Sequence, residues 1–219
     1  MKCGRHRYDH SHMSTSFTQI HPELAALLPP SLHEACRSAS HAKGERLFSA
    51  GDKPRFMFFI RSGEVLLERI GLQGEPVVLQ RTRSGIVSEA SLQSARYHCD
   101  ANVVLASEIT AVPIQKVAAA LASDPAFSNR WIGMLNREVK RLRLQCERLS
   151  LHRVEHRLMH FLETEGQNGQ HPLASGLKSL AGELGVTHEA LYRCVADMEK
   201  KRILRRDGTH LTIISPTSA

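Results

Sequence analysis

The 219-residue sequence predicts an α+β protein with a β-rich region, a long amphipathic helix, and a small helical region that ends in a hairpin. Three observations support this prediction. Turn residues interrupt short β-type runs about every eight to twelve residues between Glu45 and Gln115. An apolar repeat of about 3.5 residues follows Asp124-Pro125, and an Asp-Gly pair separates two β-type runs near the C-terminus.

The β-rich region follows two short predicted helices, Pro22–Leu28 and Leu32–Ala39, the first with proline at its opening position. Turn signals such as Ser62-Gly63 separate the runs. A parallel sheet would need helical segments between its strands, and the sequence has no such pattern here, so we expect one all-β roll or sandwich. The predicted runs are Arg46–Ser49, Phe56–Ile60, Val65–Ile70, Val77–Gln80, Val103–Leu105 and Ile109–Ile114.

The long helix is expected to begin at Asp124-Pro125, because aspartate is a good N-cap and proline suits the first helical position, and to end near Ser150. Its a and d heptad positions are Ile132, Leu135, Val139, Leu142, Cys146 and Leu149. A narrow apolar seam flanked by charged residues predicts a two-stranded parallel coiled coil, and therefore a homodimer. The alternative is an amphipathic helix that lies on its own β domain.

Composition limits the classes of partner. Lysine and arginine number 29 against 22 acidic residues, and the formal charge of +7 favours DNA or an acidic membrane. Without a membrane-spanning stretch or a secretion signal, we expect a cytoplasmic protein with no membrane partner. The cysteines lack a C-x-x-C pair, which argues against a disulfide framework or a zinc finger. They are Cys3, Cys36, Cys99, Cys146 and Cys194.

A helix-turn-helix is predicted over residues 177–202. Ala181 is small enough to let a second helix cross closely, Gly185 supplies a tight turn, and Thr187 is a side-chain N-cap for the next helix. The residues expected to be buried are Leu177, Leu180, Leu184, Val186, Leu191, Val195 and Met198. Two further β-type runs joined by Asp207-Gly208 predict a hairpin, so the motif is a winged helix-turn-helix.

The outer face of the second helix, expected over residues 187–199, indicates DNA recognition. An arginine at position 193 can bond guanine with two donors, and Glu189 can accept from cytosine N4 and orient Arg193 from one turn away. Alone, such a pair would be a surface salt bridge worth under about 1 kcal/mol. The predicted DNA-binding residues are Lys178, Thr187, His188, Glu189, Tyr192, Arg193, Lys201, Arg205 and Arg206. Among them, Lys201, Arg205 and Arg206 are placed to meet phosphates.

The chain resembles the cyclic-AMP receptor/fumarate-nitrate regulator (Crp/Fnr) superfamily over roughly residues 20–215. The matching segments are Gly51-Asp52-Lys53-Pro54, residues 59–65 and the recognition helix. The polar N-terminal stretch, with a second possible start at Met13, predicts a disordered or cloning-derived extension at 1–20. The resemblance implies a cyclic-nucleotide-binding-like β-roll at 21–123, a dimerisation helix at 124–150 and a winged helix-turn-helix domain at 151–219. It also implies a homodimer that binds palindromic double-stranded DNA and contacts RNA polymerase. The sequence shows no catalytic motif with a mechanism, so we do not expect an enzyme.

Departures from the family pattern concern the effector. Members that bind cyclic nucleotides hold the phosphate with a Gly-Glu pair and an Arg-Ser or Arg-Thr pair. In this chain Ser88-Glu89 stands in place of the first pair and Cys99-Asp100 in place of the second. A carboxylate there would repel a nucleotide phosphate. Where the family places a hydroxyl pair against adenine, this chain has Leu142 and Arg143. We therefore expect that cyclic AMP is not the effector.

Other sensory chemistries remain open as alternatives. His98 and Cys99 are candidate haem or metal ligands, but such a pair more often reflects ordinary packing, so no cofactor is predicted. Cys99 and Cys146 are thiol-sensor candidates, since Cys146 at heptad position a would face its mate in a dimer; the alternative is a small buried hydrophobe. A ligand-binding module with degenerate DNA activity is a further alternative. Many family members have arginine where His188 lies, so we expect a variant half-site.

Overall fold

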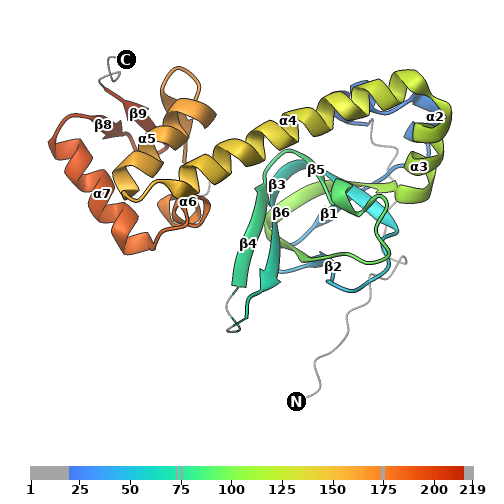
Figure 1. Ribbon diagram of the computed structural model, residues 1–219, viewed down its shortest axis with the longest axis horizontal. Helices are drawn as coiled ribbons and strands as arrows, with labels where there is room; N and C mark the ends of the chain where they lie inside the picture. The colour runs from blue at the N-terminus through green and yellow to red at the C-terminus, as the bar shows by residue number, and fades with distance from the viewer. Residues whose placement is uncertain (1–19, 73, 75, 174–175, 215–219) are drawn as a thin grey trace. The chain divides into compact units, whose positions relative to one another are not determined.

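The computed structural model describes residues 20–72, 74, 76–173 and 176–214. All but the last residue of the extension expected at 1–20 lies outside them. The chain forms two compact units, residues 1–133 and 134–219, and helix α4 contributes to both (Figure 1). The helices are α1 (Pro22–Leu27), α2 (Pro30–His33), η2 (Glu89–Ser91), α3 (Ile114–Ser123), α4 (Pro125–Ser150), α5 (Val154–Glu165), α6 (Gly176–Leu184) and α7 (His188–Lys200).

The first unit is an antiparallel six-stranded sheet with the order β1-β6-β3-β4, in which β2 also pairs with β6 and β5 with β3. Figure 1 shows the strands curling into a roll. The strands are β1 (Arg37–His41), β2 (Arg46–Phe48), β3 (Phe56–Ile70), β4 (Pro76–Thr82), β5 (Gly85–Val87) and β6 (Asp100–Pro113). With the helical second unit, this arrangement confirms the predicted α+β fold class.

Several predicted boundaries were wrong in this unit. Ser62-Gly63 is no turn: the register of β3 against β6 shifts there, so two predicted runs form one strand. The two runs predicted at 103–105 and 109–114 likewise form the single strand β6, and α3 begins at Ile114. The second predicted helix ends early, because residues 37–41 pair with β6. Pairing across the sheet overrides the weak local signal at each of these places.

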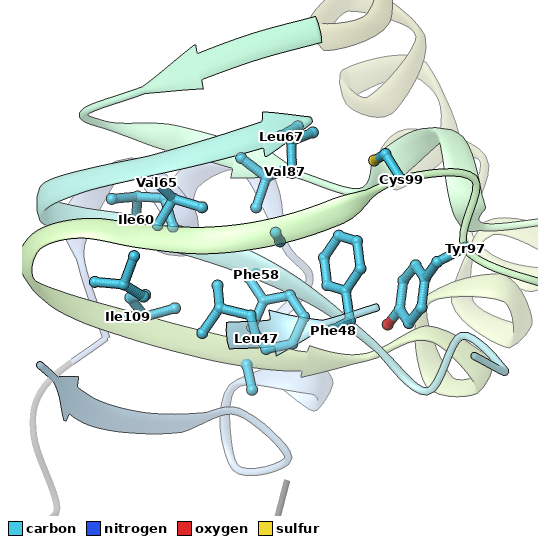
Figure 2. Close-up of a cluster of buried hydrophobic side chains, with 13 residues drawn as sticks. Leu47, Phe48, Phe58, Ile60, Val65, Leu67, Val87, Tyr97, Cys99 and Ile109 are labelled. Atoms are coloured by element: carbon cyan, nitrogen blue, oxygen red, sulfur yellow. The ribbon is translucent and has the colours of Figure 1, made fainter. Parts of the chain in front are cut away.

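The interior of the roll is filled by apolar side chains from β2, β3, β5 and β6 (Figure 2). The rings of Phe48 and Tyr97 stack with their centroids 3.9 Å apart, and Phe48 also stacks on Phe58 at 5.8 Å. Stacked aromatic pairs contribute about 0.5–1.5 kcal/mol beyond their buried area. Cys99 belongs to the same cluster and is 1% exposed. The segment that carries the sensor candidates therefore contributes to the hydrophobic core.

A buried carboxylate anchors strand β4 beside the register shift of β3. Glu64 is 2% exposed and contacts the guanidinium groups of Arg81 and Arg83, with 2.9 Å between Oε2 of Glu64 and Nε of Arg83. The backbone N–H of Glu64 donates to Ser107 Oγ at 3.0 Å. A buried charge is tolerated only when it is paired in this way, so the cluster fixes the β3–β4 pairing.

The second unit packs α5, α6 and α7 against a three-stranded antiparallel sheet of order β7-β9-β8. Its strands are β7 (Gln170–Pro172), β8 (Leu204–Arg206) and β9 (His210–Ile213). Strand β7 was not predicted, because three residues with a proline carry little β signal. The residues predicted to be buried in α6 and α7, Leu177, Leu180, Ala181, Leu184, Leu191, Val195 and Met198, are at most 4% exposed. The predicted helical core is therefore confirmed, except that Val186 in the turn is only partly buried.

Helix α4 has the predicted bounds and two different faces. Phe127 and Trp131 near its start are 0% and 4% exposed and pack edge to face. The heptad residues Ile132, Val139, Leu142, Cys146 and Leu149 are exposed in the single chain. We call these five residues the α4 seam. Leu135, the sixth predicted heptad residue, is partly buried. An apolar stripe at this spacing that stays largely exposed in one chain is typical of a coiled-coil interface.

Candidate nucleic-acid interface

The turn between α6 and α7 is built from the residues the sequence indicates. Helix α6 ends at Leu184, and Gly185 then takes a φ of +63°, a region where a residue without Cβ is unstrained. The Val186 N–H donates to the Ala181 carbonyl at 3.0 Å, which closes the turn. Thr187 is the N-cap of α7 and its hydroxyl accepts from the Ala190 N–H at 3.2 Å. The start of α7 is thereby fixed relative to α6.

The outer face of α7 carries the residues predicted to read bases. Glu189, Tyr192 and Arg193 are exposed, and the ring of His188 packs edge-on against Tyr192 with centroids 4.3 Å apart. This contact orients the imidazole along the helix surface. A donor-rich guanidinium, a carboxylate and two rings on one exposed edge match the groups that contact base edges in a major groove.

The carboxylate of Glu189 accepts hydrogen bonds at the N-terminus of α7. Hydrogen bonds from its backbone N–H and from the Thr187 hydroxyl lower the pKa of Glu189, and the nearby charges of His188 and Arg193 lower it further. The carboxylate is thus ionised at neutral pH and ready to accept a hydrogen bond. The hydrogen bonds to this carboxylate thus come from the start of α7.

The basic residues around this face differ in their surroundings. Lys178, Arg205 and Arg206 are exposed, and the two arginines lie on β8 at the wing. Lys201 Nζ lies 2.7 Å from Asp197 Oδ2, and the hydrogen bond to that carboxylate raises the pKa of Lys201. A lysine that already has a carboxylate partner gains less free energy when it contacts a DNA phosphate. Arg205 and Arg206 are therefore the better candidates for phosphate contacts.

The hairpin of the wing is closed as the Asp-Gly signal predicts. The Asp207 N–H donates to the His210 carbonyl at 3.2 Å, and the His210 N–H donates to Asp207 Oδ1 at 2.9 Å. Gly208 takes a φ of +87°, which the turn requires. The Arg206 N–H donates to Glu199 Oε1 at 3.1 Å, which ties the wing to the end of α7.

The predicted sensor residues of the roll do not converge on one point. Cys99 is buried in the core, whereas the adjacent His98 is exposed, so the two side chains do not form a common ligand pair. Burial, and then the charge of Asp100, raise the pKa of the Cys99 thiol to about 11. At neutral pH this leaves almost no thiolate, the form that reacts with oxidants and metals. Cys99 behaves as a small core hydrophobe.

Both carboxylate oxygens of Asp100 already have partners within the first unit. Its Oδ1 accepts from the Ala50 N–H at 2.7 Å, and Oδ2 lies 3.4 Å from Nη1 of Arg46. Glu89 opens the short helix η2 after Ser88, which has a φ of +67°. Among the described residues, no group of three or more histidine, cysteine or acidic side chains is arranged to hold a metal ion.

The candidates on α4 lie outside the roll's strands. Leu142 belongs to the α4 seam, and Arg143 beside it is exposed. Cys146 is exposed on the same seam, so a disulfide with a second copy stays a prediction. Within the described ranges, no helix is long and apolar enough to cross a bilayer.

Comparisons with known proteins identify a matching domain family and similar chains. Residues 39–124 match the cyclic nucleotide-binding domain family. The fumarate and nitrate reduction regulatory protein of Vibrio cholerae is 25% identical over 79% of this chain and 73% of its own length. The global nitrogen regulator of Synechocystis is 22% identical over 94% of this chain and 97% of its own length.

The fold comparison extends over both units. The structure of FixK2 from Bradyrhizobium japonicum superposes with a TM-score of 0.66 at 14% identity and covers 84% of this chain and 99% of its own. The matched domain, the curated relatives and the fold neighbours together support the Crp/Fnr superfamily for this chain. The family resemblance drawn from the sequence is therefore confirmed, and the relatives of this Crp/Fnr protein are bacterial transcriptional regulators.

Sequence reasoning missed one residue that organises the interface. Arg157 on α5 donates hydrogen bonds to backbone carbonyls at the end of α4 and at the end of α6. Its partners are main-chain atoms, so no pairing of side chains in the sequence marks it. The sequence shows only an arginine within two turns after the end of a long helix, which is no specific signal.

Proposed function

We propose that this Crp/Fnr protein is a sequence-specific DNA-binding transcriptional regulator that acts as a homodimer. The observation that carries the proposal is the exposed edge of α7, where Glu189 and Arg193 stand one turn apart beyond a helix start fixed by Thr187. Arginine and glutamate together select a guanine-cytosine pair. The exposed α4 seam supports pairing of two chains, and a two-fold dimer would present two such edges to a palindromic site.

We assign one proposed role to each of three successive segments of the chain. A sensory domain occupies residues 21–123, a dimerisation helix 124–150 and a DNA-binding domain 151–219. By analogy with the relatives' regulatory role, the bound dimer would contact RNA polymerase. The wing arginines Arg205 and Arg206 would meet phosphates, which positions the domain without reading sequence.

Two arginine substitutions separate base reading from phosphate contact. Arg193→Ala should cost about 1–3 kcal/mol on a preferred duplex and relax one base position in each half-site, because a bidentate base contact is lost. Arg205→Ala should weaken all duplexes alike and reduce the salt dependence of binding, because it removes a charge next to the phosphates. Fluorescence anisotropy on the preferred duplex and on single-base variants measures both effects. Equal losses on every duplex for Arg193→Ala would contradict base reading by this residue.

The effector proposed for the roll is something other than cyclic AMP. Asp100 already bonds Ala50 and Arg46, and the neighbouring Cys99 is buried in the apolar core, so a nucleotide phosphate would meet a carboxylate without an arginine from this segment. Like charges at close range repel, so this segment would offer a nucleotide phosphate no favourable contact of its own. Titration calorimetry of the full chain with cyclic AMP should therefore detect no binding at micromolar concentrations. A saturable heat with micromolar affinity would overturn this part of the proposal.

A further inference from the structure

Two helix ends meet at one guanidinium group in the second unit. Arg157 Nε donates to the Leu151 carbonyl at 2.6 Å, and Nη2 donates to the Leu149 carbonyl at 3.0 Å. Nη1 donates to the carbonyls of Leu184 and Gly185 at 3.0 and 3.1 Å. Leu149 and Leu151 flank the end of α4, whereas Leu184 and Gly185 flank the end of α6.

The chemistry of helix ends explains why an arginine lies there. The last carbonyls of a helix have no partner within it and carry the negative end of the helix dipole. A guanidinium presents five N–H donors in a rigid plane, so one residue can satisfy carbonyls from two helices at once. Lysine has three donors on a single nitrogen and cannot span the same four oxygens in this geometry. Arg157 therefore joins α4 and α6 through their main chains.

An apolar contact at the same place makes the junction tight. A Cβ added to Gly185 would lie 2.9 Å from Leu149 Cδ2 and 3.4 Å from Arg157 Nη1. The last seam residue of α4 thus packs directly over the turn that precedes the recognition helix. A change in the direction of the last turn of α4 would move Leu149, Arg157 and this turn together.

We propose that Arg157 is a positioning residue that sets the recognition helix relative to the dimer helix and so fixes the spacing between half-sites that the dimer accepts. This inference rests on the proposed DNA-binding dimer. Arg157 touches no base in this proposal. It acts through the turn at Gly185, from which Thr187 starts α7. In a two-fold dimer the distance between the two recognition helices depends on this junction in each chain.

The test uses Arg157→Lys, which keeps the charge and most of the stem but not the four-carbonyl geometry. The matched control is Arg153→Lys, at an exposed arginine one turn earlier. Binding is measured on duplexes that carry two preferred half-sites at the natural spacing and at spacings changed by one or two base pairs. For Arg157→Lys we expect a roughly tenfold loss at the natural spacing and a smaller loss at altered spacings, so the spacing preference flattens. Arg153→Lys should keep the preference.

A readout without DNA accompanies the binding series. Hydrogen exchange of the free protein should become faster in peptides that contain Leu149–Leu151 and Leu184–Thr187, and thermal unfolding should still be cooperative. An Arg157→Lys protein with unchanged spacing preference and unchanged exchange would overturn the inference. A loss of equal size at every spacing would also overturn it, since that is the effect of a merely structural role. If the unaltered protein prefers no DNA sequence, the proposed function itself fails. In that case the hydrogen-exchange measurement alone tests whether Arg157 joins α4 and α6, and unchanged exchange in Arg157→Lys would contradict that role.

Discussion

A chain in which Val139 and Leu142 are both replaced by aspartate is expected to be monomeric and to bind a two-half-site duplex at least about 100-fold more weakly than the original chain. Both side chains belong to the α4 seam and are 44% and 41% exposed in the single chain. In a dimer they would be buried, and four carboxylates facing one another across the seam would be strongly repelled. Loss of the second half-site removes the avidity of a two-site contact, which is about 10²–10⁴-fold.

The control for this experiment has the same change in charge. Arg137→Asp also lowers the charge by two units, but Arg137 is exposed at heptad position f, opposite the seam. Sedimentation equilibrium should show dimers for the unaltered chain and for Arg137→Asp, and monomers for the double variant. Circular dichroism verifies that the helices persist. A double variant that sediments as a dimer would refute the α4 seam as the dimer interface.

Gly63→Ala is expected to destabilise the roll by about 3 kcal/mol or more, the second large effect. Gly63 has a φ of +94°, and a Cβ there would lie 2.2 Å from Ser107 Oγ and 2.4 Å from the Ala106 carbonyl oxygen. The strain of a positive φ contributes about 1 kcal/mol, and the overlap with strand β6 adds the rest, because the backbone there cannot move without breaking the pairing.

Gly44 provides a control at the same backbone angle. Its φ is also +94°, but a Cβ there would have no atom within 4 Å. Gly44→Ala should therefore cost only about 1 kcal/mol, so the difference between the two variants measures the steric overlap alone. Thermal and urea unfolding of both proteins give the two free energies of unfolding. Equal destabilisation by the two substitutions would show that β6 yields to the new methyl group.

The sequence predicts the second unit better than the roll, for a physical reason. Helix caps and periodic apolar faces are local, so the start of α4 at Pro125, the N-cap at Thr187 and the buried face of α7 follow from a few neighbouring residues. Strand pairing is non-local. Ser62-Gly63 has the composition of a turn, yet pairing with β6 draws it into one long strand with a register shift.

The candidate site divides in the same way. The recognition edge at Glu189 and Arg193 follows from the helical period, whereas the hydrogen bond of Glu189 back to Thr187 and the Lys201–Asp197 pair needed the three-dimensional structure. His98 and Cys99 look like a ligand pair in the sequence, but the chain bends at these residues and leaves His98 exposed while Cys99 is buried. Arg157 has only backbone partners, which leave no trace in the sequence.

In vitro selection from a randomised pool of double-stranded DNA tests the central claim most directly. The full-length chain is incubated with the pool, bound duplexes are recovered over several rounds and the products are sequenced. A homodimer that reads bases through Glu189 and Arg193 should enrich an inverted repeat with a guanine-cytosine pair in each half-site and half-site centres about one helical turn apart. Recovery of a pool with no enriched motif, or of a single unrepeated half-site, would contradict the account of this protein as a dimeric, sequence-specific regulator.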